Sequence, residues 1–411
     1  MLAEHAEFDV HTARESLRAV PECAGIFALF GADAGSEPYV GRTPNLRRRM
    51  ARLLQPQPTQ TRRLELAGRV RRIEWQRTGS DFEQNLLLYR AMLPVFGERT
   101  LKRLHLRAPH FVRMAGTNAY PRIYVTNRIS QRSAEWFFGP FPSRAAAERY
   151  TEELLNLFLL RRCHEDLEPY PEHPGCVYSE MKMCLAPCFK GCSDERYAEE
   201  SAAVRGFLAT RGASLIRALE TERAAASAAL EFERAANAHK RLQKAETVSA
   251  LASELVHPLS ELRALILQPS AEVGCVDVFL LERGVLSGPE RYSTMGMRLA
   301  NEQSGSTSLF AQPMAVEAVP LEEPGTIVTR DALVERLMAV VGALNSTIAA
   351  GVGADLTPSL ALVNRWYARP ATKRAGEIFF PGEDASWPAK AVVRGISRVA
   401  AGALVLPSIS Q

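Results

Sequence analysis

Five of the seven cysteines in this 411-residue chain fall within a short stretch, which points to metal chemistry. They are Cys163, Cys176, Cys184, Cys188 and Cys192, and the first four follow the pattern C-x12-C-x7-C-x3-C. In the cytoplasm, clustered thiols serve metals more often than disulfides. Zinc usually takes pairs separated by roughly two to four residues, and only the last two intervals here are that close. The spacing therefore predicts metal ligation and leaves zinc and an iron–sulfur cluster both open.

A second group of reactive side chains lies near the N-terminus. The sequence GIF at 25–27 is followed by YVG at 39–41, by Arg42 and by the basic run 47–49. This arrangement resembles the GIY-YIG nuclease motif. Cutting a phosphodiester bond needs a base for water, positive charge on the phosphate and a metal held by a carboxylate. The resemblance implies that these residues share a shallow site of that kind.

The resemblance assigns roles position by position. Tyr39 matches the second motif tyrosine, which implies a base or proton relay, and Arg49 matches the helix arginine that faces the phosphate. Arg42 stands where a lysine is usual, so the charge is kept with a different geometry. Phe27 replaces the first motif tyrosine, so one hydroxyl is lost.

The metal position departs from the family pattern. In that family a glutamate at the end of a leucine run holds Mg²⁺ or Mn²⁺, and here Tyr89 follows the leucines 86–88. Glu83 lies six residues earlier, about 240° away round a helix, and does not take over that position. Without the carboxylate the site loses a Lewis acid, and each ~1.4 kcal/mol lost is tenfold in rate. An active nuclease and a strongly impaired one both stay open.

The segment that leads into the cysteines resembles a second family. The run from Trp136 to Cys188, WFFGPFPSRAAAERYTEELLNLFLLRRC followed by MCLAPC, is very similar to the region after the nuclease domain in the UvrC family of excinucleases. The extent is closest to the short UvrC homologue Cho. The resemblance implies a four-iron, four-sulfur (4Fe-4S) cluster held by the first four cysteines of the stretch. Cys192 is an extra thiol.

A helical stretch after the cysteines resembles the UVR motif. The residues are ALEFERAA at 229–236 and KRL at 240–242, within a stretch of about 222–256. In UvrC proteins that hairpin pairs with a similar motif on UvrB, because its apolar face is too large for so small an element to bury alone. The alternative is an ordinary amphipathic helix packed inside this protein.

These motifs need elements to position them, and the first unit is predicted over 15–100. Short apolar runs bounded by glycine predict two strands joined as a hairpin, then a helix, a third strand over 71–78 and a second helix. Thr43 is the expected N-cap of the first helix, with Pro44 at its first position. Ser80 is expected to cap the second helix, which should end at Pro94.

Three further segments follow. Residues 101–192 are expected to hold three strands, a helix over 143–160 that leads directly to Cys163, and the cysteines. Residues 193–256 suggest two antiparallel helices. Residues 257–411 suggest an α/β segment with strands at 274–288, 325–330 and 402–407, a helix at 331–345, and four aspartates, at 277, 331, 355 and 384, on the surface or at caps. The fold class is therefore a multidomain α+β protein.

Charge is spread unevenly along the chain. Residues 1–163 hold 26 Lys and Arg against 16 Asp and Glu, whereas the remainder holds 24 against 30. The stretch Arg99–Ala134 carries eight basic residues and no acid. Such an excess can neutralise phosphates, which makes Arg47, Arg48, Lys102 and Arg103 candidate DNA contacts. The plainer alternative is a solvated arginine-rich surface.

The cellular context follows from what the sequence lacks. There is no run of eighteen apolar residues, so no membrane span is expected, and the acidic N-terminus is unlike a signal peptide. These features predict a cytoplasmic protein. Three hypotheses stay open: a UvrC-like endonuclease that acts with UvrB and nicks damaged double-stranded DNA near the lesion, a non-catalytic paralogue that binds DNA and UvrB, and an iron–sulfur regulator that binds DNA.

Overall fold

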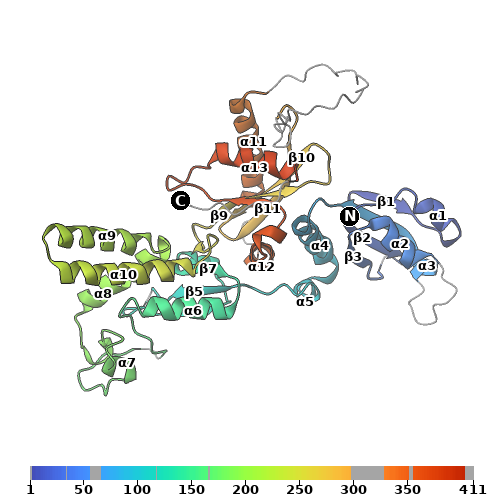
Figure 1. Ribbon diagram of the computed structural model, residues 1–411. Helices are drawn as coiled ribbons and strands as arrows, with labels where there is room; N and C mark the ends of the chain where they lie inside the picture. The colour runs from blue at the N-terminus through green and yellow to red at the C-terminus, as the bar shows by residue number, and fades with distance from the viewer. Residues whose placement is uncertain are drawn as a thin grey trace.

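The computed structural model describes residues 2–33, 35–55, 66–116, 118–164, 167–297, 328–350 and 355–402. In these ranges the chain forms three four-stranded sheets, each with antiparallel pairing throughout, together with helices that cover them. Figure 1 shows the first sheet at one end of the molecule, the long helices α9 and α10 at the other, and the C-terminal sheet between them. The predicted mixed α+β class is confirmed.

The first sheet has the strand order β1-β4-β2-β3. Its strands are β1 (Glu4–Glu7), β2 (Gly25–Gly31), β3 (Tyr39–Thr43) and β4 (Val70–Arg77). Its helical segments are η1 (Val10–Thr12), α1 (Ala13–Ser16), α2 (Leu46–Leu54), α3 (Leu66–Arg69), α4 (Asp81–Phe96) and α5 (Arg99–Arg103). The expected β2–β3 hairpin is confirmed.

The two faces of this sheet are covered by different helices. Alternate strand residues point to opposite faces, so Phe27 packs on the α2 side while its neighbour Ile26 packs on the α4 side. Ser80 caps α4 as expected, because its side chain accepts a hydrogen bond from the Glu83 N–H. The predicted end at Pro94 is wrong by two residues, since α4 continues to Phe96.

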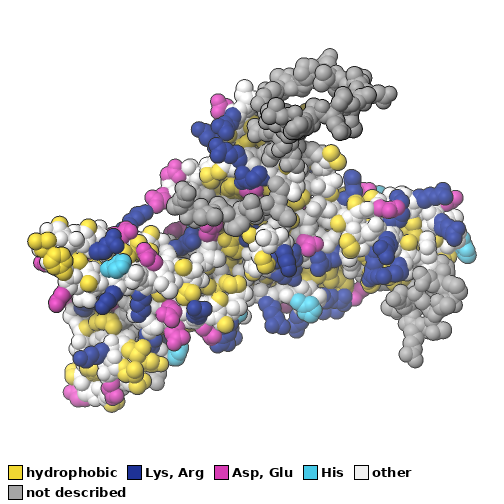
Figure 2. Space-filling view, in the orientation of Figure 1, with side chains coloured by type: hydrophobic (Ala, Val, Ile, Leu, Met, Phe, Trp, Pro, Cys, Tyr) yellow, Lys and Arg dark blue, Asp and Glu magenta, His cyan; other side chains and the backbone are white. Residues whose placement is uncertain are grey.

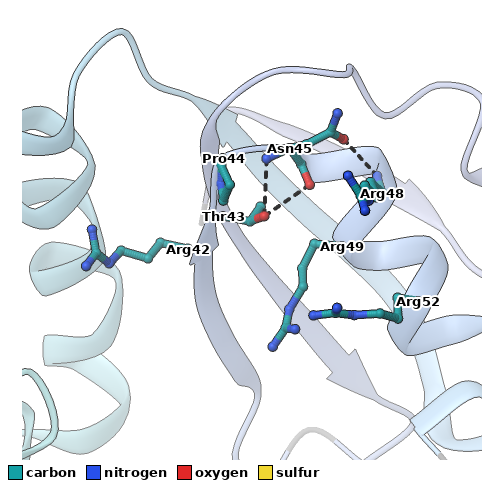
Figure 3. Close-up of a pocket in the computed structure, with 7 residues that line it drawn as sticks. All are labelled: Arg42, Thr43, Pro44, Asn45, Arg48, Arg49 and Arg52. Carbon is teal, nitrogen blue, oxygen red and sulfur yellow. Dashed lines mark hydrogen bonds between the residues drawn. The ribbon is translucent and has the colours of Figure 1, made fainter.

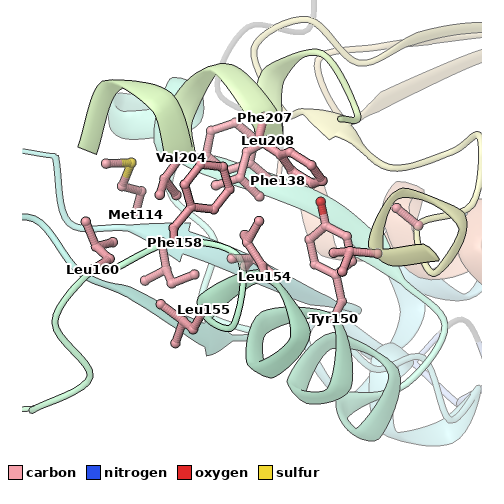
Figure 4. Close-up of a cluster of buried hydrophobic side chains, with 14 of the residues drawn as sticks. Met114, Phe138, Tyr150, Leu154, Leu155, Phe158, Leu160, Val204, Phe207 and Leu208 are labelled. Atoms are coloured by element: carbon pink, nitrogen blue, oxygen red, sulfur yellow. The ribbon is translucent and has the colours of Figure 1, made fainter. Parts of the chain in front are cut away.

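The middle sheet has the order β6-β5-β7-β8. Its elements are β5 (His110–Met114), β6 (Ile123–Thr126), η2 (Gln131–Trp136), β7 (Phe137–Phe141), α6 (Arg144–Leu155) and β8 (His257–Pro258). Figure 4 shows α6 facing the helices that follow the cysteines across a shared core, in which Tyr150, Leu154 and Phe207 are fully buried. Helix α6 ends at Leu155, so it reaches Cys163 through a short irregular segment instead of directly.

Three helices, not the expected two, follow the cysteines: α8 (Asp194–Ala209), α9 (Ala213–Ala228) and α10 (Phe232–Ala250). The extra break falls at Gly212, whose φ of 93° cannot continue a right-handed helix. Helices α9 and α10 form an antiparallel hairpin (Figure 1) that turns at Leu230. At this tip Leu230 and Phe232 are 71% and 70% exposed.

The C-terminal sheet has the order β11-β10-β9-β12. Its elements are β9 (Arg263–Pro269), β10 (Cys275–Glu282), β11 (Val285–Ser293), α11 (Arg330–Ala350), α12 (Leu356–Tyr367), η5 (Ala371–Lys373), β12 (Glu377–Phe379) and α13 (Ala389–Ala400). Helices α11 and α13 cover one face, and α12 covers the other, where it also meets α4. The strand expected at 402–407 lies outside the described residues except for its first residue. Residues 325–327, the first half of the strand expected at 325–330, also lie outside the described residues. Residue 330 of that expected strand is the first residue of α11.

Helix α11 is long and apolar enough, by length and composition alone, to cross a membrane. In the fold, however, Leu333, Leu337, Val341 and Leu344 are buried in the core beneath the C-terminal sheet. This one-sided packing is the arrangement of a surface helix that covers a sheet.

Buried polar groups lie where α4 of the first unit contacts the C-terminal sheet, a contact that we call the joint. Glu83 on α4 and Asp277 on β10 are 5% and 1% exposed, and each carboxyl group influences the pKa of the other. Burial raises the pKa of Glu83 to about 7 and that of Asp277 to about 6. Beside them, a Cβ added at Gly79 would lie 2.2 Å from the Pro269 carbonyl oxygen. The expectation that Asp277 is a surface or cap residue is therefore wrong, whereas Asp355 does cap α12.

Candidate nucleic-acid interface

Helix α2 follows β3 after a two-residue connection and carries the basic run of the N-terminal motif. Its N-cap is Asn45, whose side chain accepts a hydrogen bond from the Arg48 N–H at 2.8 Å. The expected cap, Thr43, instead accepts the Asn45 N–H in the preceding turn, because Pro44 lies outside the helix. Leu46, Met50 and Leu54 bury the opposite side of α2 and so fix which way its arginines face.

The loop between β3 and α2 borders a hollow of about 310 Å³. Figure 3 shows its lining, which comes from β3, the turn and one side of α2. The lining residues are Arg42, Thr43, Pro44, Asn45, Arg48, Arg49 and Arg52. We call this the arginine pocket. It contains four arginines and no carboxylate, so its potential is strongly positive and suits a phosphate.

The structure brings together two of the predicted site residues. Arg49 Nη2 lies 3.4 Å from Tyr39 Oη, and Tyr39 is 39% exposed. Phe27 stands beside them, with its ring centroid 6.0 Å from that of Tyr39. The Phe27 ring has room because Gly41 has no side chain; a Cβ there would lie 3.1 Å from the ring. A phenol and a guanidinium therefore share one exposed corner of the site.

Arg42 is placed differently from Tyr39 and Arg49. Strand alternation turns its side chain to the α4 face, as Figure 3 shows, where its Nη1 lies 3.4 Å from Gln84 Oε1. Gln84 is buried and is itself held by the Gly25 and Thr43 carbonyls, each 3.1 Å from Nε2. The structure thus places the Arg42 guanidinium away from the Tyr39 hydroxyl.

The four predicted DNA contacts differ in how free their charges are. Arg47 is held by the Val20 and Arg18 carbonyls and by Glu22, so it anchors the N-terminal segment. Arg103 pairs with Glu37 and stacks on the Phe96 ring at 3.8 Å. Arg48 and Lys102 are exposed. Arg52 also lines the pocket and was not among the predicted contacts, although its place one helical turn beyond Arg48 indicates it.

No carboxylate takes the metal position in the described part of the N-terminal unit. Glu83 is committed to the joint, where it accepts the Gly79 N–H at 2.7 Å. Tyr89 packs against the core between α4 and α12. Among the described residues, no group of three or more His, Cys, Asp or Glu side chains is arranged to hold a metal ion.

Three of the four predicted cysteine ligands nevertheless act electrostatically on the fourth, Cys184. Burial raises the pKa of the Cys184 thiol, and the neighbouring thiols of Cys176, Cys188 and Cys163 raise it further. The pKa of Cys188 is raised by burial and by two of the same neighbours. Cys192 differs, because the charged groups that act on its pKa, after burial, are Asp194 and Arg196. The charged groups that act on the pKa of Cys192 therefore differ from the thiols that act on Cys184 and Cys188.

The backbone around these thiols is unusual. Lys182, Ala186 and Lys190 all have left-handed φ values of 54° to 58°, which cost free energy in residues that carry a Cβ. A guanidinium nitrogen of Arg161, which is itself buried, lies 3.5 Å from Cys163 Sγ. The surrounding helices are α7 (Val177–Glu180) and η3 (Pro187–Phe189), at the end of the molecule away from the arginine pocket (Figure 1). The cysteine prediction stays a prediction, at a site distant from the N-terminal motif.

Comparison with known proteins now adds a family. Residues 110–207 match the family described as UvrC/Cho excinuclease, middle domain. The UvrABC system protein C of Alcanivorax borkumensis is 29% identical over 273 residues, which cover 61% of this chain and 43% of that protein. The protein of the same name from Desulforudis audaxviator is 30% identical over 324 residues, or 76% of this chain and 52% of that protein.

The chain thus spans about half the length of the curated relatives it matches. No solved structure matches it. The matched residues hold three of the four strands of the middle sheet (β5, β6 and β7), α6, the cysteine segment and most of α8. The chain is thus similar to the UvrC/Cho excinuclease middle domain over residues 110–207 and, more distantly, to UvrC proteins over about 70% of its length.

Proposed function

We propose that this chain is a cytoplasmic DNA-repair protein of nucleotide excision repair whose N-terminal unit binds the phosphates of damaged double-stranded DNA without efficient cleavage. The observation that carries the proposal is the arginine pocket, which is lined by Arg48, Arg49 and Arg52 of α2, borders Arg42 of β3 and has no carboxylate. Cationic side chains alone supply phosphate affinity, whereas hydrolysis at a useful rate also needs a positioned metal or base. The nearest helical glutamate, Glu83, is buried in the joint and faces Asp277.

A second candidate, incision of the damaged strand with Mg²⁺ or Mn²⁺, is favoured by one contact. Tyr39 and Arg49 stand 3.4 Å apart at the exposed edge of the pocket, where a phenol could assist water and a guanidinium could face the phosphate. The metal would then need ligands from the DNA phosphate and water, because the pocket lining offers no carboxylate.

An incision assay separates the two candidates. The full chain is mixed with UvrA, UvrB and a lesion-bearing duplex, in Mg²⁺ and separately in Mn²⁺, and both binding and nicking are followed. We expect retention of the duplex without nicking. Nicking by wild type that disappears in Tyr39→Phe, with DNA binding unchanged, would reject binding without cleavage and support the endonuclease.

We place the UvrB contact at the α9–α10 hairpin. Leu230 and Phe232 at its tip are large apolar side chains left in solvent, which a second helical hairpin could cover. Glu222, Arg234 and Arg241 form ion pairs beside them and could set the register of a partner helix. Phe232→Ser should weaken UvrB binding without changing DNA affinity, whereas an unchanged UvrB affinity would remove the hairpin from the interface.

The cofactor we propose for the middle domain is a 4Fe-4S cluster held by Cys163, Cys176, Cys184 and Cys188. Support comes from the electrostatic effect of the other thiols on Cys184 and Cys188 and from Arg161, whose guanidinium lies 3.5 Å from Cys163 Sγ. When bound, the cluster would cross-link the segment around Cys163 to α7 and η3. Arg161 would hold Cys163, and the left-handed residues would turn the chain so that the thiols converge.

Anaerobic purification tests the cluster. Wild type should be brown, with broad absorbance near roughly 400 nm and iron and sulfide in equal amounts. Cys184→Ser should lose both colour and iron. The matched control is Cys192→Ser, which should keep them. A colourless protein with one equivalent of zinc would reject the cluster.

A further inference from the structure

A second group of arginines lies where the first unit meets the C-terminal sheet. Arg42 comes from β3 and Arg365 from α12, whereas Arg369 follows the C-terminal end of α12. Helices α4 and α12 pack against each other through Phe82 and Trp366, and this contact brings the three side chains together. We call these three residues the joint arginines.

The joint arginines carry more positive charge than the structure neutralises. Arg369 pairs with Asp81 at 3.2 Å. Arg42 contacts the Gln84 amide oxygen and Arg365 contacts the Leu104 carbonyl, both at 3.4 Å, so each meets only a neutral acceptor among the described residues. Burial lowers the pKa of Arg365, and the charges of Arg42 and Arg369 lower it further. Three guanidiniums near one carboxylate leave a site that gains free energy from an added anion.

The joint arginines continue the arginine pocket. Arg42 borders that pocket through β3 while its guanidinium reaches toward α4 and α12, so it lies between the two groups. Figure 2 shows Lys and Arg side chains spread along the face that runs from α2 past α4 to α5 and α12. The same face carries a narrow hollow between α4 and α12, lined by Asn85, Arg365 and Arg369 among others. The two sites therefore form one basic track across the joint.

We propose that the joint arginines are a second phosphate-binding subsite, through which α12 of the C-terminal segment holds the backbone of the nucleic acid that occupies the arginine pocket. This inference rests on the proposed DNA-binding function and assigns part of that function to residues beyond the N-terminal motif. Backbone phosphates repeat along a strand, so an extended track binds several in series and contacts no base.

The test uses Arg365, because it belongs only to the C-terminal segment and does not line the arginine pocket. The full chain and its variants are titrated, without UvrB, against a fluorescent duplex at several NaCl concentrations. Arg365→Gln should weaken binding about fivefold and lower the slope of log affinity against log salt by about 1. Arg365→Lys should keep most of both. Arg217→Gln, which removes one exposed arginine from α9, is the matched control and should match wild type.

Two comparisons decide the outcome. If Arg365→Gln binds with wild-type affinity and salt slope while Arg49→Gln binds weakly, the subsite is rejected and the arginine pocket stands. If both variants bind like wild type, the pocket and the subsite are rejected together. Thermal unfolding of each variant guards against misfolding, and weak binding by Arg365→Gln that Arg365→Lys restores supports a role for charge over packing.

Discussion

Helix α2 of the first unit and the C-terminal sheet with its covering helix α13 both carry arginines, but these arginines are used differently. On the C-terminal sheet Arg398 is held by both oxygens of the buried Glu377, at 2.8 and 2.6 Å, and Arg263 pairs with Glu282. On α2, by contrast, Arg48 and Arg52 have no acidic partner among the described residues, and Arg49 meets only a phenol.

This difference separates arginines that build the fold from arginines that await a ligand. A guanidinium already bound to a buried carboxylate cannot give up that partner without stranding a charge. A guanidinium that faces solvent without an acidic partner breaks no ion pair when it binds a phosphate. Its binding also releases counterions from the nucleic acid. Residue counts alone cannot make this distinction, because both regions carry arginines.

The largest effect is expected from removing the unpaired charges. The triple variant Arg48→Gln, Arg49→Gln and Arg52→Gln should bind duplex DNA on the order of a hundredfold more weakly, with the salt slope lower by about 3, because three phosphate contacts are lost. Its thermal unfolding should match wild type. Anisotropy titrations and calorimetry measure the two quantities. Equal DNA affinity of the triple variant and wild type would show that the arginines without acidic partners on α2 do not bind DNA.

The next effect concerns the joint that holds the two sheets together. Glu83 has a folded-state pKa of about 7, above its ordinary value of 4.5, so the folded protein binds a proton that the unfolded chain has released. Its contribution to stability is complete below about pH 4.5 and is lost as pH rises through about 7. Wild type should therefore lose on the order of 2 kcal/mol between pH 5 and pH 8 from this group.

Glu83→Gln checks this loss, since the amide stays neutral at every pH. Its free energy of unfolding, measured by urea at pH 5, 6, 7 and 8, should fall less than that of wild type. Arg291 and Glu272 flank Asp277 and modify the profile, so the comparison is between the two curves, not their absolute values. Parallel curves for variant and wild type would show that the pair does not titrate in this range.

The smallest effect is expected from a paired arginine. Arg398→Gln strands the Glu377 carboxylate, which is 6% exposed, and should lower the free energy of unfolding by about 1–2 kcal/mol, a value reduced because Arg398 itself is 41% exposed. DNA affinity should not change. The exposed pair of Arg144 and Glu148 supplies the control, for which Arg144→Gln should cost well under ~1 kcal/mol.

Local signals in the sequence predicted much of the first unit. The glycine-bounded runs gave the β2–β3 hairpin, and Ser80 marked the start of α4, because caps and alternation act over a few residues. Alternation also places Tyr39 and Arg42 on opposite faces of β3, which the motif resemblance alone does not convey. The cap of α2 moved from Thr43 to Asn45 because either side chain can accept an N–H in that turn.

Long-range pairings could not be predicted in this way. Asp277 carries no local mark of burial, and only the packing of α4 on the C-terminal sheet brings it to Glu83. The joint arginines depend on the same packing, since Arg42 and Arg365 lie in opposite halves of the sequence. The break at Gly212 was available from the sequence, where a glycine follows Thr210-Arg211, but a predominantly helical composition concealed it.

The glycine at position 79 has a consequence for motion. Main chain meets main chain there, so no rotamer change could absorb a larger residue, and even one methyl group would have to push the sheets apart. The angle between the two sheets is thus set by backbone contact and not by adjustable side chains. The added methyl group of an alanine at this position would therefore change the angle between the two sheets. It would do so without altering the side chains of either hydrophobic core.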